Sequence, residues 1–471
     1  MPTSSPSRRR SSSRCASTPR PTRSWPSSAT TSRRGCRDAA HLSTVGVWGA
    51  WHLGSVVAAG LAAFGHEVWV TDLSEAAVAQ LSSGVAPVRE PGLDDLIAGQ
   101  LAAETLHPVP ATDPRLGDLE YSVIAADVEV LDDDTASLGT LEALVKQMGS
   151  VLHGPTVLIV MSQVPVGTSH RLAESIGEAA GRPVPVACMP ENLRLGGALD
   201  VFFHPDRLVI GADDPKVAAR VRQLFSPLDC PVVTMSVASA EMSKHAMNAY
   251  LATCISFMSQ LSDLCEAVGA DAWAVAAALK ADGRVSPRAP LLPGLGFAGG
   301  TLGRDLQSLR AAGATHGVPA DLFDAVWSVN RRRLSSTVDR VRALVGELAG
   351  ARIGVLGLTY KPGTSTLRRS QSIELARGLV SGGATVVAHD PTVEPSAGVE
   401  LGFPVAGDPY AVAADADALV LMTTWPDYRA LDPQRLAATM RRRIVFDPGG
   451  FLDAAGLVDA GFVHAVVGRP A

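Results

Sequence analysis

The first residues that could do chemistry form a glycine-rich turn. Gly49, Trp51 and Gly54 occupy the three positions of a G-x-G-x-x-G fingerprint, directly after the apolar segment Val45–Trp48. In such a turn the first glycine permits the tight bend, the second lets the backbone approach a pyrophosphate, and the third lets a helix pack on the strand. The spacing therefore indicates a site for a dinucleotide.

The start of the following helix would complete this site. The backbone N–H groups of His52 and Leu53 have no partner inside the helix and can face the phosphates. Asp72, 23 residues after Gly49, closes the next apolar segment, where a carboxylate binds the ribose hydroxyls of NAD. Thr71–Glu75 holds no Arg or Lys for a 2′-phosphate, so NAD is favoured over NADP.

Trp51 departs from this pattern because a side chain stands where the second glycine is expected. One interpretation is a nucleotide-free unit in which the indole fills the vacant site. We expect instead that NAD binds and that the indole turns away from the phosphates or stacks along the edge of the site.

Lys244 and Asn248 are a second pair with chemical potential. They are four residues apart in a predicted helix, so they share one face. An ammonium and an amide directed at one oxygen suit hydride transfer, because both stabilise a developing negative charge. Spacing alone also allows a solvated lysine beside a neutral helix neighbour.

Alternating apolar and helical segments must position these residues. Short apolar runs between helices predict an α/β fold with a doubly wound parallel sheet. The expected strands are VGVWGA, EVWVTD, YSVIAA, TVLIVMS, VPVACMP and RLVIGAD in the first half, with ARIGVLG, ATVVAHDP, ADALVLMTTW and RRIVFDPGG near the C-terminus.

The segment from Val237 to about Leu348 differs, with long helical stretches and few strand candidates. The predicted organisation is a tail at 1–42, an NAD-binding Rossmann domain at 43–215, a central helical domain at 216–348 that dimerises and carries catalytic residues, and a smaller Rossmann-like nucleotide-sugar domain at 349–471.

Composition narrows the function. Residues 1–42 carry nine Arg, eleven Ser and one acid, which predicts a disordered tail, with a transit peptide as the alternative. The rest holds 32 basic and 46 acidic residues, which argues against nucleic acid as a partner. No apolar run is long enough for a membrane span. Six scattered cysteines favour the cytoplasm, and the 11 dispersed histidines predict no metal site.

Ten motifs in order extend the analysis to the whole chain after Val45. They are GHEVWVTDLS, REPGLDDLI, QVPVGTS, MPENLRLGGAL, HPDRLVIG, AEMSKHAMNAY, PGLGFAGGTLGRD, GLTYKPGTSTLRRS, AHDP and TTWPDYR. Together they resemble the UDP-glucose/GDP-mannose dehydrogenase family. The resemblance implies an NAD domain, a helical centre and a nucleotide-sugar domain, with a UDP-sugar as the expected substrate and a homodimer as the expected assembly.

The resemblance also implies roles for individual residues. Lys244 and Asn248 match a motif whose Lys and Asn stabilise the oxyanion. In GFAGGTLGRD the family's nucleophilic cysteine falls on Thr301 and its aspartate on Asp305. The family's lysine falls on Arg304, which is expected to bind the cofactor. The cysteine captures an aldehyde as a thiohemiacetal, and a threonine hydroxyl has no comparably accessible anion. No cysteine lies within thirty residues of Thr301, and Cys265 is expected to be a packed core residue.

Further matches and departures follow. Glu191 is kept, whereas Leu195 replaces a second glutamate, Gln163 replaces a threonine that helps hold water, and Ala126–Val130 replaces a VPTP turn near the cofactor. Ser365 and Thr366 replace two aspartates, and Asp447–Gly450 lacks an arginine. The residues expected to hold the sugar nucleotide are Leu193, Arg194, Phe297, Gly299 and Lys361, while Arg368 is expected to reach a phosphate or the cofactor.

Three hypotheses remain. The favoured one is an NAD-dependent oxidoreductase that acts on the CH–OH group of a nucleotide-linked sugar without a covalent thioester step. The second is a UDP-glucose 6-dehydrogenase that makes the full uronic acid by an unusual second step. The third is a non-catalytic protein that binds sugar nucleotides.

Overall fold

The computed structural model describes residues 42–131, 133–298 and 300–470. The predicted tail at residues 1–42 lies, except for Leu42, outside the described residues.

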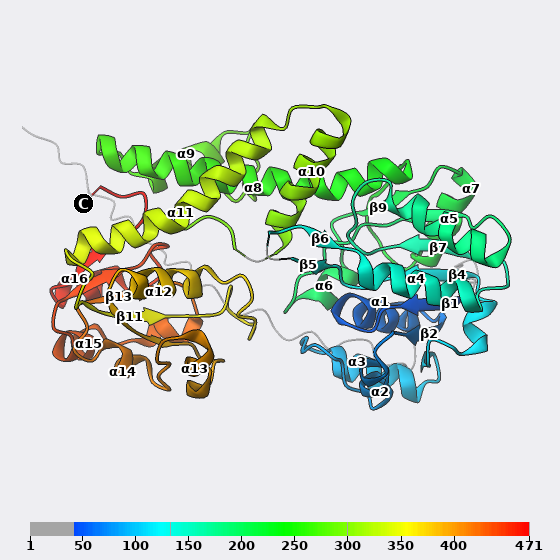
Figure 1. Cartoon of the computed structure of the whole chain (residues 1–471), viewed down its shortest axis with the longest axis horizontal. Coiled ribbons are helices and arrows are strands. Elements are labelled where there is room, and N and C mark those ends of the chain that lie inside the picture. The colour runs from blue at the N-terminus through cyan, green and yellow to red at the C-terminus, as the bar shows by residue number, and fades with distance from the viewer. Residues whose placement is uncertain (1–41, 132, 299, 471) are drawn as a thin grey trace, which may run out of the picture. The chain divides into compact units, whose positions relative to one another are not determined.

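Within the described residues the first half forms an eight-stranded sheet (Figure 1). In spatial order its strands are β10 (Val232–Met235), β9 (Leu208–Gly211), β8 (Val186–Cys188), β7 (Val157–Val160), β4 (Tyr121–Ile124), β1 (Thr44–Trp48), β2 (Glu67–Thr71) and β3 (Leu106–Pro108). The helices are α1 (His52–Ala63), α2 (Glu75–Ser82), α3 (Leu93–Ala102), α4 (Gly139–Val151), α5 (Thr168–Ala180), α6 (Ala198–Phe203) and α7 (Pro215–Leu224), and β5 (Glu129–Val130) pairs with β6 (Ala136–Ser137) in a separate hairpin.

Alternation along β1 explains why helices cover both faces of this sheet. Val45 and Val47 belong to one buried cluster, which includes side chains from α1 and α3. Trp48 belongs to a second cluster with side chains from α4 and α5. The described strand pairs of this sheet are parallel except β8 with β9, which confirms the predicted doubly wound architecture.

The order of the central strands fixes where a ligand can bind. The connection from β1 leads to β2 on one side, whereas β4 lies on the other side of β1. The carboxyl ends of β1 and β4 therefore border the crevice at which doubly wound folds hold dinucleotides.

The structure places the end of the first sheet later than predicted. We expected the first domain to end at residue 215, but β10 pairs with β9 in parallel through Met235. Its side chains are intermediate or exposed, as expected of a strand at the edge of a sheet, although three of its four residues are apolar.

Four central helices follow, namely α8 (Val237–Val268), α9 (Ala272–Ala281), α10 (Thr301–His316) and α11 (Asp321–Val345). The Ser236 hydroxyl caps the start of α8 by accepting the Ser239 N–H. Left-handed Gly269 ends this helix. One continuous helix thus carries both Lys244 and Asn248.

A five-stranded parallel sheet forms the last part of the chain. Its strands are, in spatial order, β12 (Thr385–His389), β11 (Arg352–Leu356), β13 (Ala418–Leu421), β14 (Ile444–Phe446) and β15 (Val463–Ala465), and its helices are α12 (Gln371–Ser381), α13 (Gly398–Leu401), α14 (Pro409–Ala413), α15 (Pro433–Thr439) and α16 (Ala454–Asp459). Strand order reverses between β11 and β13, which makes a second ligand crevice at their carboxyl ends.

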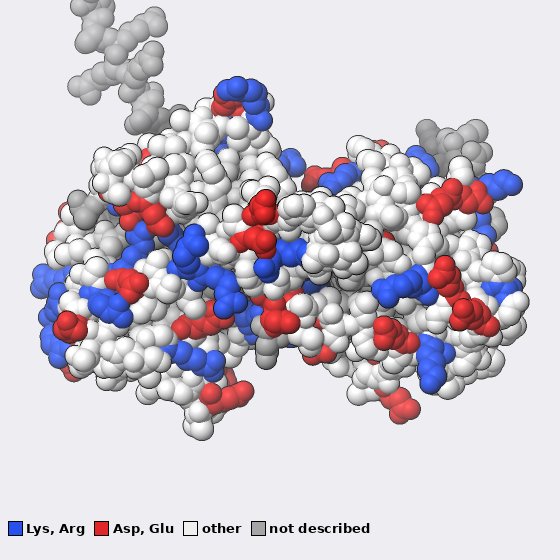
Figure 2. Space-filling model, turned by 45° about the horizontal axis from the view of Figure 1, so that its top comes forward, with Lys and Arg blue, Asp and Glu red and all other residues white. Residues whose placement is uncertain are grey.

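The surface mixes both signs of charge. Figure 2 shows Lys and Arg side chains interspersed with Asp and Glu on the face in view. Among the described helices, none combines the length and apolar character that crossing a bilayer requires.

Candidate active site

The largest cavity described here, about 610 Å³, is where several predicted residues meet. Lys244 and Asn248 reach it from α8, and Thr301 lies at the first position of α10. The loop after β8 contributes to its wall with Glu191, Leu193 and Arg194, and Lys361 comes from the loop after β11. Residues that are far apart in the sequence therefore share one hollow of the size that holds a small organic ligand.

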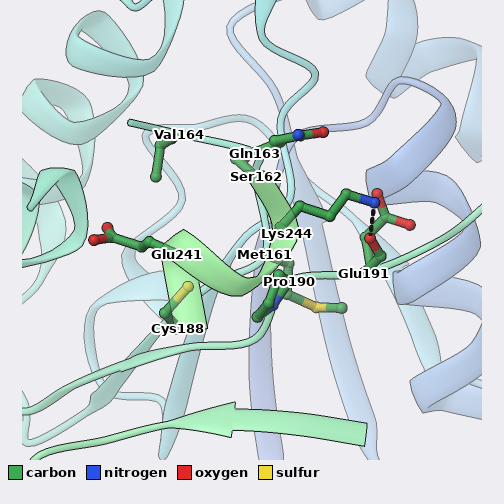
Figure 3. A pocket seen from close by; sticks show the side chains of 9 residues that line it. All are labelled: Met161, Ser162, Gln163, Val164, Cys188, Pro190, Glu191, Glu241 and Lys244. Carbon is green, nitrogen blue, oxygen red and sulfur yellow. Dashed lines mark hydrogen bonds between the residues drawn. The ribbon is translucent and has the colours of Figure 1, made fainter. Parts of the chain in front are cut away.

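Lys244 is held by the loop after β8. Its Nζ donates to the carbonyl oxygen of Glu191 at 2.5 Å (Figure 3). It also donates to Asn192 Oδ1 at 3.1 Å. An ammonium has three donors, so one N–H remains for a ligand oxygen. Burial lowers the pKa of Lys244, an effect that the charges of Glu191 and Asp305 oppose.

Glu191 stands beside this lysine with a different environment. Burial raises the pKa of its carboxyl group, whereas the charge of Lys244 and the Leu193 N–H lower it. Its carboxylate accepts a short hydrogen bond from the backbone N–H of Leu193, which fixes the first turn of the loop after β8. A carboxyl with a raised pKa is suited to exchange protons near neutral pH.

Asp305 is the centre of a buried polar cluster. Its side chain is 0% exposed and accepts hydrogen bonds from His245 Nδ1 at 3.0 Å, from Asn248 and from Gln163. Burial alone would raise the pKa of Asp305, but the His245 hydrogen bond and the charge of Arg304 outweigh it and lower that pKa. Asp305 is therefore held as an ionised acceptor.

Arg304 closes the cluster from the side of α10. Its guanidinium donates to the side-chain oxygen of Gln163, whose amide nitrogen donates to Asp305. The Arg304 Nε lies 3.6 Å from Asp305 Oδ1 without a hydrogen bond. Gln163 thus bridges a cation and an anion. Arg304 was predicted to bind the cofactor, and in the structure its guanidinium belongs to this cluster.

One face of α8 supplies further residues that sequence reasoning did not assign. Glu241 accepts the N–H groups of Gly167 and Ser169 at 2.6 and 2.7 Å, which ties α8 to the start of α5. His245 contacts Asp305 and, through Nε2, the Val164 carbonyl at 2.9 Å. Glu241, His245 and Asn248 are spaced by four and three residues, and all are buried. Their helical spacing from Asn248 was therefore the signal that could have identified Glu241 and His245.

Thr301 lines the large cavity, and no described cysteine does so. Cys188 lines a separate small cavity of about 10 Å³, which Lys244 also lines (Figure 3). Burial raises the pKa of the Cys188 thiol to about 12, so it is not a ready nucleophile at neutral pH. Cys265 is buried in α8, as expected of a packing residue.

The residues expected to hold a substrate divide into two groups. Lys361 Nζ donates to the Leu195 carbonyl at 3.0 Å and lines the large cavity together with Arg194. Phe297 is different, since its backbone exchanges two hydrogen bonds with Asn330 and its ring is buried against α8 and α11. Phe297 therefore shapes the loop without lining the large cavity, and Gly299 lies outside the described residues.

A second cavity of about 410 Å³ adjoins the carboxyl ends of β11, β13 and β14. Tyr360, Lys361 and Gly449 line it together with the loop Gly294–Gly296. Lys361 borders both this cavity and the larger one. A ligand with two parts could therefore span them.

The cofactor turn has the backbone that a dinucleotide site needs. Gly49 has a φ of +122°, and a Cβ there would lie 2.6 Å from the Ala125 carbonyl oxygen. A Cβ on Gly54 would lie 1.8 Å from the Gly49 carbonyl oxygen. Asp72 accepts the Ala50 N–H at 2.7 Å and so stands at the end of β2 beside the turn. The chain thus fits an NAD adenosine, with Asp72 toward its ribose.

Three residues at the end of this turn, where the pyrophosphate is expected, differ from the usual arrangement of a dinucleotide site. Trp51 ends the loop before α1 with a side chain that is 52% exposed, so its indole does not fill the interior. His52 Nε2 contacts Glu90 at 3.0 Å, and Glu90 also accepts the N–H groups of Gly196 and Ala198. The Leu53 N–H donates to Asp127 at 3.4 Å.

Arg368 does not contact the glycine turn. Its guanidinium donates to the Val130 carbonyl in the hairpin that follows β4. Arg369 next to it pairs with Asp134 of the same hairpin. These two arginines hold the loop after β11 against the hairpin.

Comparisons with known proteins match this architecture. Three family models cover the chain in order: the NAD binding domain of the UDP-glucose/GDP-mannose dehydrogenase family at residues 43–229, its central domain at 238–332 and its UDP binding domain at 354–454.

Individual relatives match over nearly their whole lengths. The UDP-glucose 6-dehydrogenase of Rhizobium meliloti (strain 1021) is 35% identical over 90% of this chain and 98% of its own length. TuaD, a UDP-glucose 6-dehydrogenase of Bacillus subtilis (strain 168), is 32% identical over 91% and 94%. The structure of a UDP-glucose dehydrogenase from Pyrobaculum islandicum superimposes with a TM-score of 0.83 at 30% identity, covering 93% of this chain and 100% of that one. With its NAD-binding turn, its shared cavity and its second nucleotide crevice, the chain belongs to the UDP-glucose/GDP-mannose dehydrogenase family.

Proposed function

We propose that this protein is an NAD-dependent dehydrogenase that removes one hydride from a CH–OH group of a UDP-linked sugar, without forming a covalent thioester. The observation that carries the proposal is the cavity in which Lys244, Asn248 and Glu191 meet Thr301 in place of a cysteine.

Lys244 and Asn248 would bind the reacting oxygen. Lys244 has one N–H beyond those that it donates to the loop, and Asn248 directs one amide hydrogen to Asp305, which leaves the other. As the C–H bond breaks and the oxygen gains negative charge, both donors stabilise it more than they stabilise the alcohol.

Glu191 would take the hydroxyl proton. The alcohol must lose one proton and one hydride, and the bound NAD supplies the hydride acceptor. Glu191 lines the cavity beside Lys244 with a raised pKa, so it can accept a proton and release it to water afterwards. The carbonyl product keeps its oxygen, and no bond to the protein is required.

Two features argue against the second oxidation. A threonine hydroxyl at position 301 is a poor nucleophile unless a strong base lies beside it. The Asp305 carboxylate already accepts from His245, Asn248 and Gln163, so it has little capacity left to activate a water. An aldehyde or ketone is then the expected product.

The UDP moiety would occupy the cavity at the carboxyl ends of β11 and β13. Residues 354–454 match a UDP binding domain. Lys361 borders both cavities and so could contact a phosphate between the uridine and the sugar.

Counting reducing equivalents tests the proposal. With UDP-glucose, related UDP-sugars and excess NAD, one NADH should form per substrate consumed, and mass spectrometry should find a carbonyl product. Two NADH with a uronic acid would favour the full oxidation. Binding of UDP-sugars without any NADH would favour a non-catalytic binding protein.

Thr301→Cys sharpens this test. The introduced thiol should trap the aldehyde covalently or add acid formation, both visible by mass spectrometry. Thr315→Cys is the matched control, because Thr315 is an exposed residue of the same helix outside the cavity. An unchanged product in Thr301→Cys would contradict the placement of this residue at the reacting carbon.

We further propose that the protein is a homodimer that associates through α8. Tyr250, Phe257 and Leu264 repeat every seven residues along this helix, and each is half exposed or more. A heptad stripe of exposed apolar side chains is typical of helix-to-helix association. Sedimentation should show a dimer, and the double variant F257E/L264E should be monomeric, whereas Val399→Glu should leave the dimer intact.

A further inference from the structure

Asp127 lies where sequence comparison already indicated a change, in the segment Ala126–Val130 that follows β4. Its Oδ2 accepts the backbone N–H of Leu53 at 3.4 Å. Leu53 is the second residue of α1, and N–H groups in the first turn of a helix have no partner inside the helix. A side-chain anion of the protein therefore contacts this helix start.

The contacted group is one that the fold offers to its cofactor. In a dinucleotide site of this kind the pyrophosphate lies at the N-terminus of the helix that follows the glycine turn. Gly49 keeps the tight bend of the turn, Gly54 keeps the close packing of the helix on it, and Asp72 stands at the end of β2 beside it. A carboxylate oxygen on the Leu53 N–H thus stands where a phosphate oxygen would be expected.

The charges around Asp127 do not neutralise it fully. Partial withdrawal from water raises its pKa, His52 and Arg304 lower it, and the neighbouring Asp72 raises it. His52 is already paired with Glu90, and the Arg304 guanidinium is committed to Gln163. Asp127 itself is an exposed residue of the crevice.

We propose that Asp127 is an internal competitor for the cofactor pyrophosphate, and that it weakens NAD binding by occupying the Leu53 N–H and by repelling the phosphates. The carboxylate must leave this N–H when the dinucleotide binds. Asp127 thereby sets the affinity for the pyrophosphate without touching the adenosine.

Calorimetric titration with two probes tests this role without turnover. ADP-ribose contains the pyrophosphate, whereas adenosine does not. We expect Asp127→Asn and Asp127→Ala to bind ADP-ribose about tenfold more tightly than the unchanged protein, a gain within the range for one charged contact. Adenosine affinity should stay the same.

Asp95→Asn is the matched control. It removes the same charge from an exposed position on α3 of the same domain, so it should leave both affinities unchanged. Melting curves of each variant confirm folding, and the near-isosteric Asp127→Asn guards against a loop rearrangement in Asp127→Ala. Equal or weaker ADP-ribose binding in folded Asp127 variants would overturn the proposal, as would a gain that appears equally with adenosine or with Asp95→Asn.

Discussion

The two ligand regions of this protein differ in how their charges are arranged. The substrate cavity is lined by four cations, namely Arg194, Arg207, Lys244 and Lys361, together with the acids Glu191 and Asp206. The cofactor crevice contains Asp72 and Asp127 on backbone N–H groups, and the nearby Arg304 guanidinium donates to Gln163. One fold therefore keeps a conventional electrostatic design for one anionic ligand and departs from it for the other.

The difference shows which part of a site is hard to change. A reacting oxygen needs donors at fixed positions, so moving them would remove the chemistry. A pyrophosphate is held by several backbone N–H groups, so the loss of one of them lowers the affinity for the cofactor without abolishing binding. Single substitutions in the substrate region should accordingly change mainly the catalytic rate. Single substitutions in the cofactor region should change mainly the affinity for the cofactor.

Lys244→Met should produce the largest effect. Removing the ammonium from the reacting oxygen should lower kcat by about 10³-fold, as loss of one oxyanion donor does. NADH formation with UDP-glucose measures it, and Lys146→Met, at an exposed position of α4, is the control. Wild-type turnover in folded Lys244→Met would break the contrast between the two regions.

The same lysine predicts a pH dependence. Burial lowers its folded pKa, so the protonated form that is needed for catalysis is lost on the alkaline side at a pH below the ordinary range of a lysine. The alkaline limb of kcat/KM should therefore fall below pH 10.5. Lys244→Arg should move that limb upward even if it lowers the rate.

Gly54→Ala should come next and tests the backbone of the cofactor region. Its Cβ would lie 1.8 Å from the Gly49 carbonyl oxygen, so the turn must shift at a cost of about 3 kcal/mol in the free energy of unfolding. Gly99→Ala is the control, because a Cβ there meets nothing within 4 Å and alanine favours the helix by up to about 1 kcal/mol. Thermal unfolding separates the two, and equal melting temperatures would contradict the close approach.

Lys361→Ala should have the smallest effect of the three. Losing its contacts should weaken UDP binding by about tenfold, equal to about 1.4 kcal/mol, with ADP-ribose affinity unchanged. Separate calorimetric titrations with UDP and with ADP-ribose measure the two affinities, and Lys216→Ala, exposed at the start of α7, serves as the comparison. Loss of ADP-ribose binding would show that the two regions are not separable in this way.

Sequence patterns predicted those features that depend on local order. Apolar strands such as Tyr121–Ile124 are buried along their length, and the i, i+4 spacing placed Lys244 and Asn248 on one helix. The edge strand β10 was not predicted, although three of its four residues are apolar; it is short, and α8 begins two residues after its end.

Side-chain pairings between distant segments could not be predicted in the same way. Gln163 was identified as a substitution, but its bridge between Arg304 and Asp305 depends on how α10 meets the loop after β7. Asp127 lies 74 residues from Leu53, and only the packing of β4 beside β1 brings the two together. Such contacts arise from tertiary structure, so spacing along the chain does not contain them.

Glu90 connects the cofactor region and the substrate region. Its buried carboxylate contacts His52, the first residue of α1. It also accepts the backbone N–H groups of Gly196 and Ala198, next to the residues that line the substrate cavity, at 2.7 and 2.8 Å. A ligand that moved one side would have to stretch these contacts, which would couple it to the other side. By thermodynamic reciprocity, if bound cofactor changes the affinity for the substrate through this contact, bound substrate changes the affinity for the cofactor by the same factor.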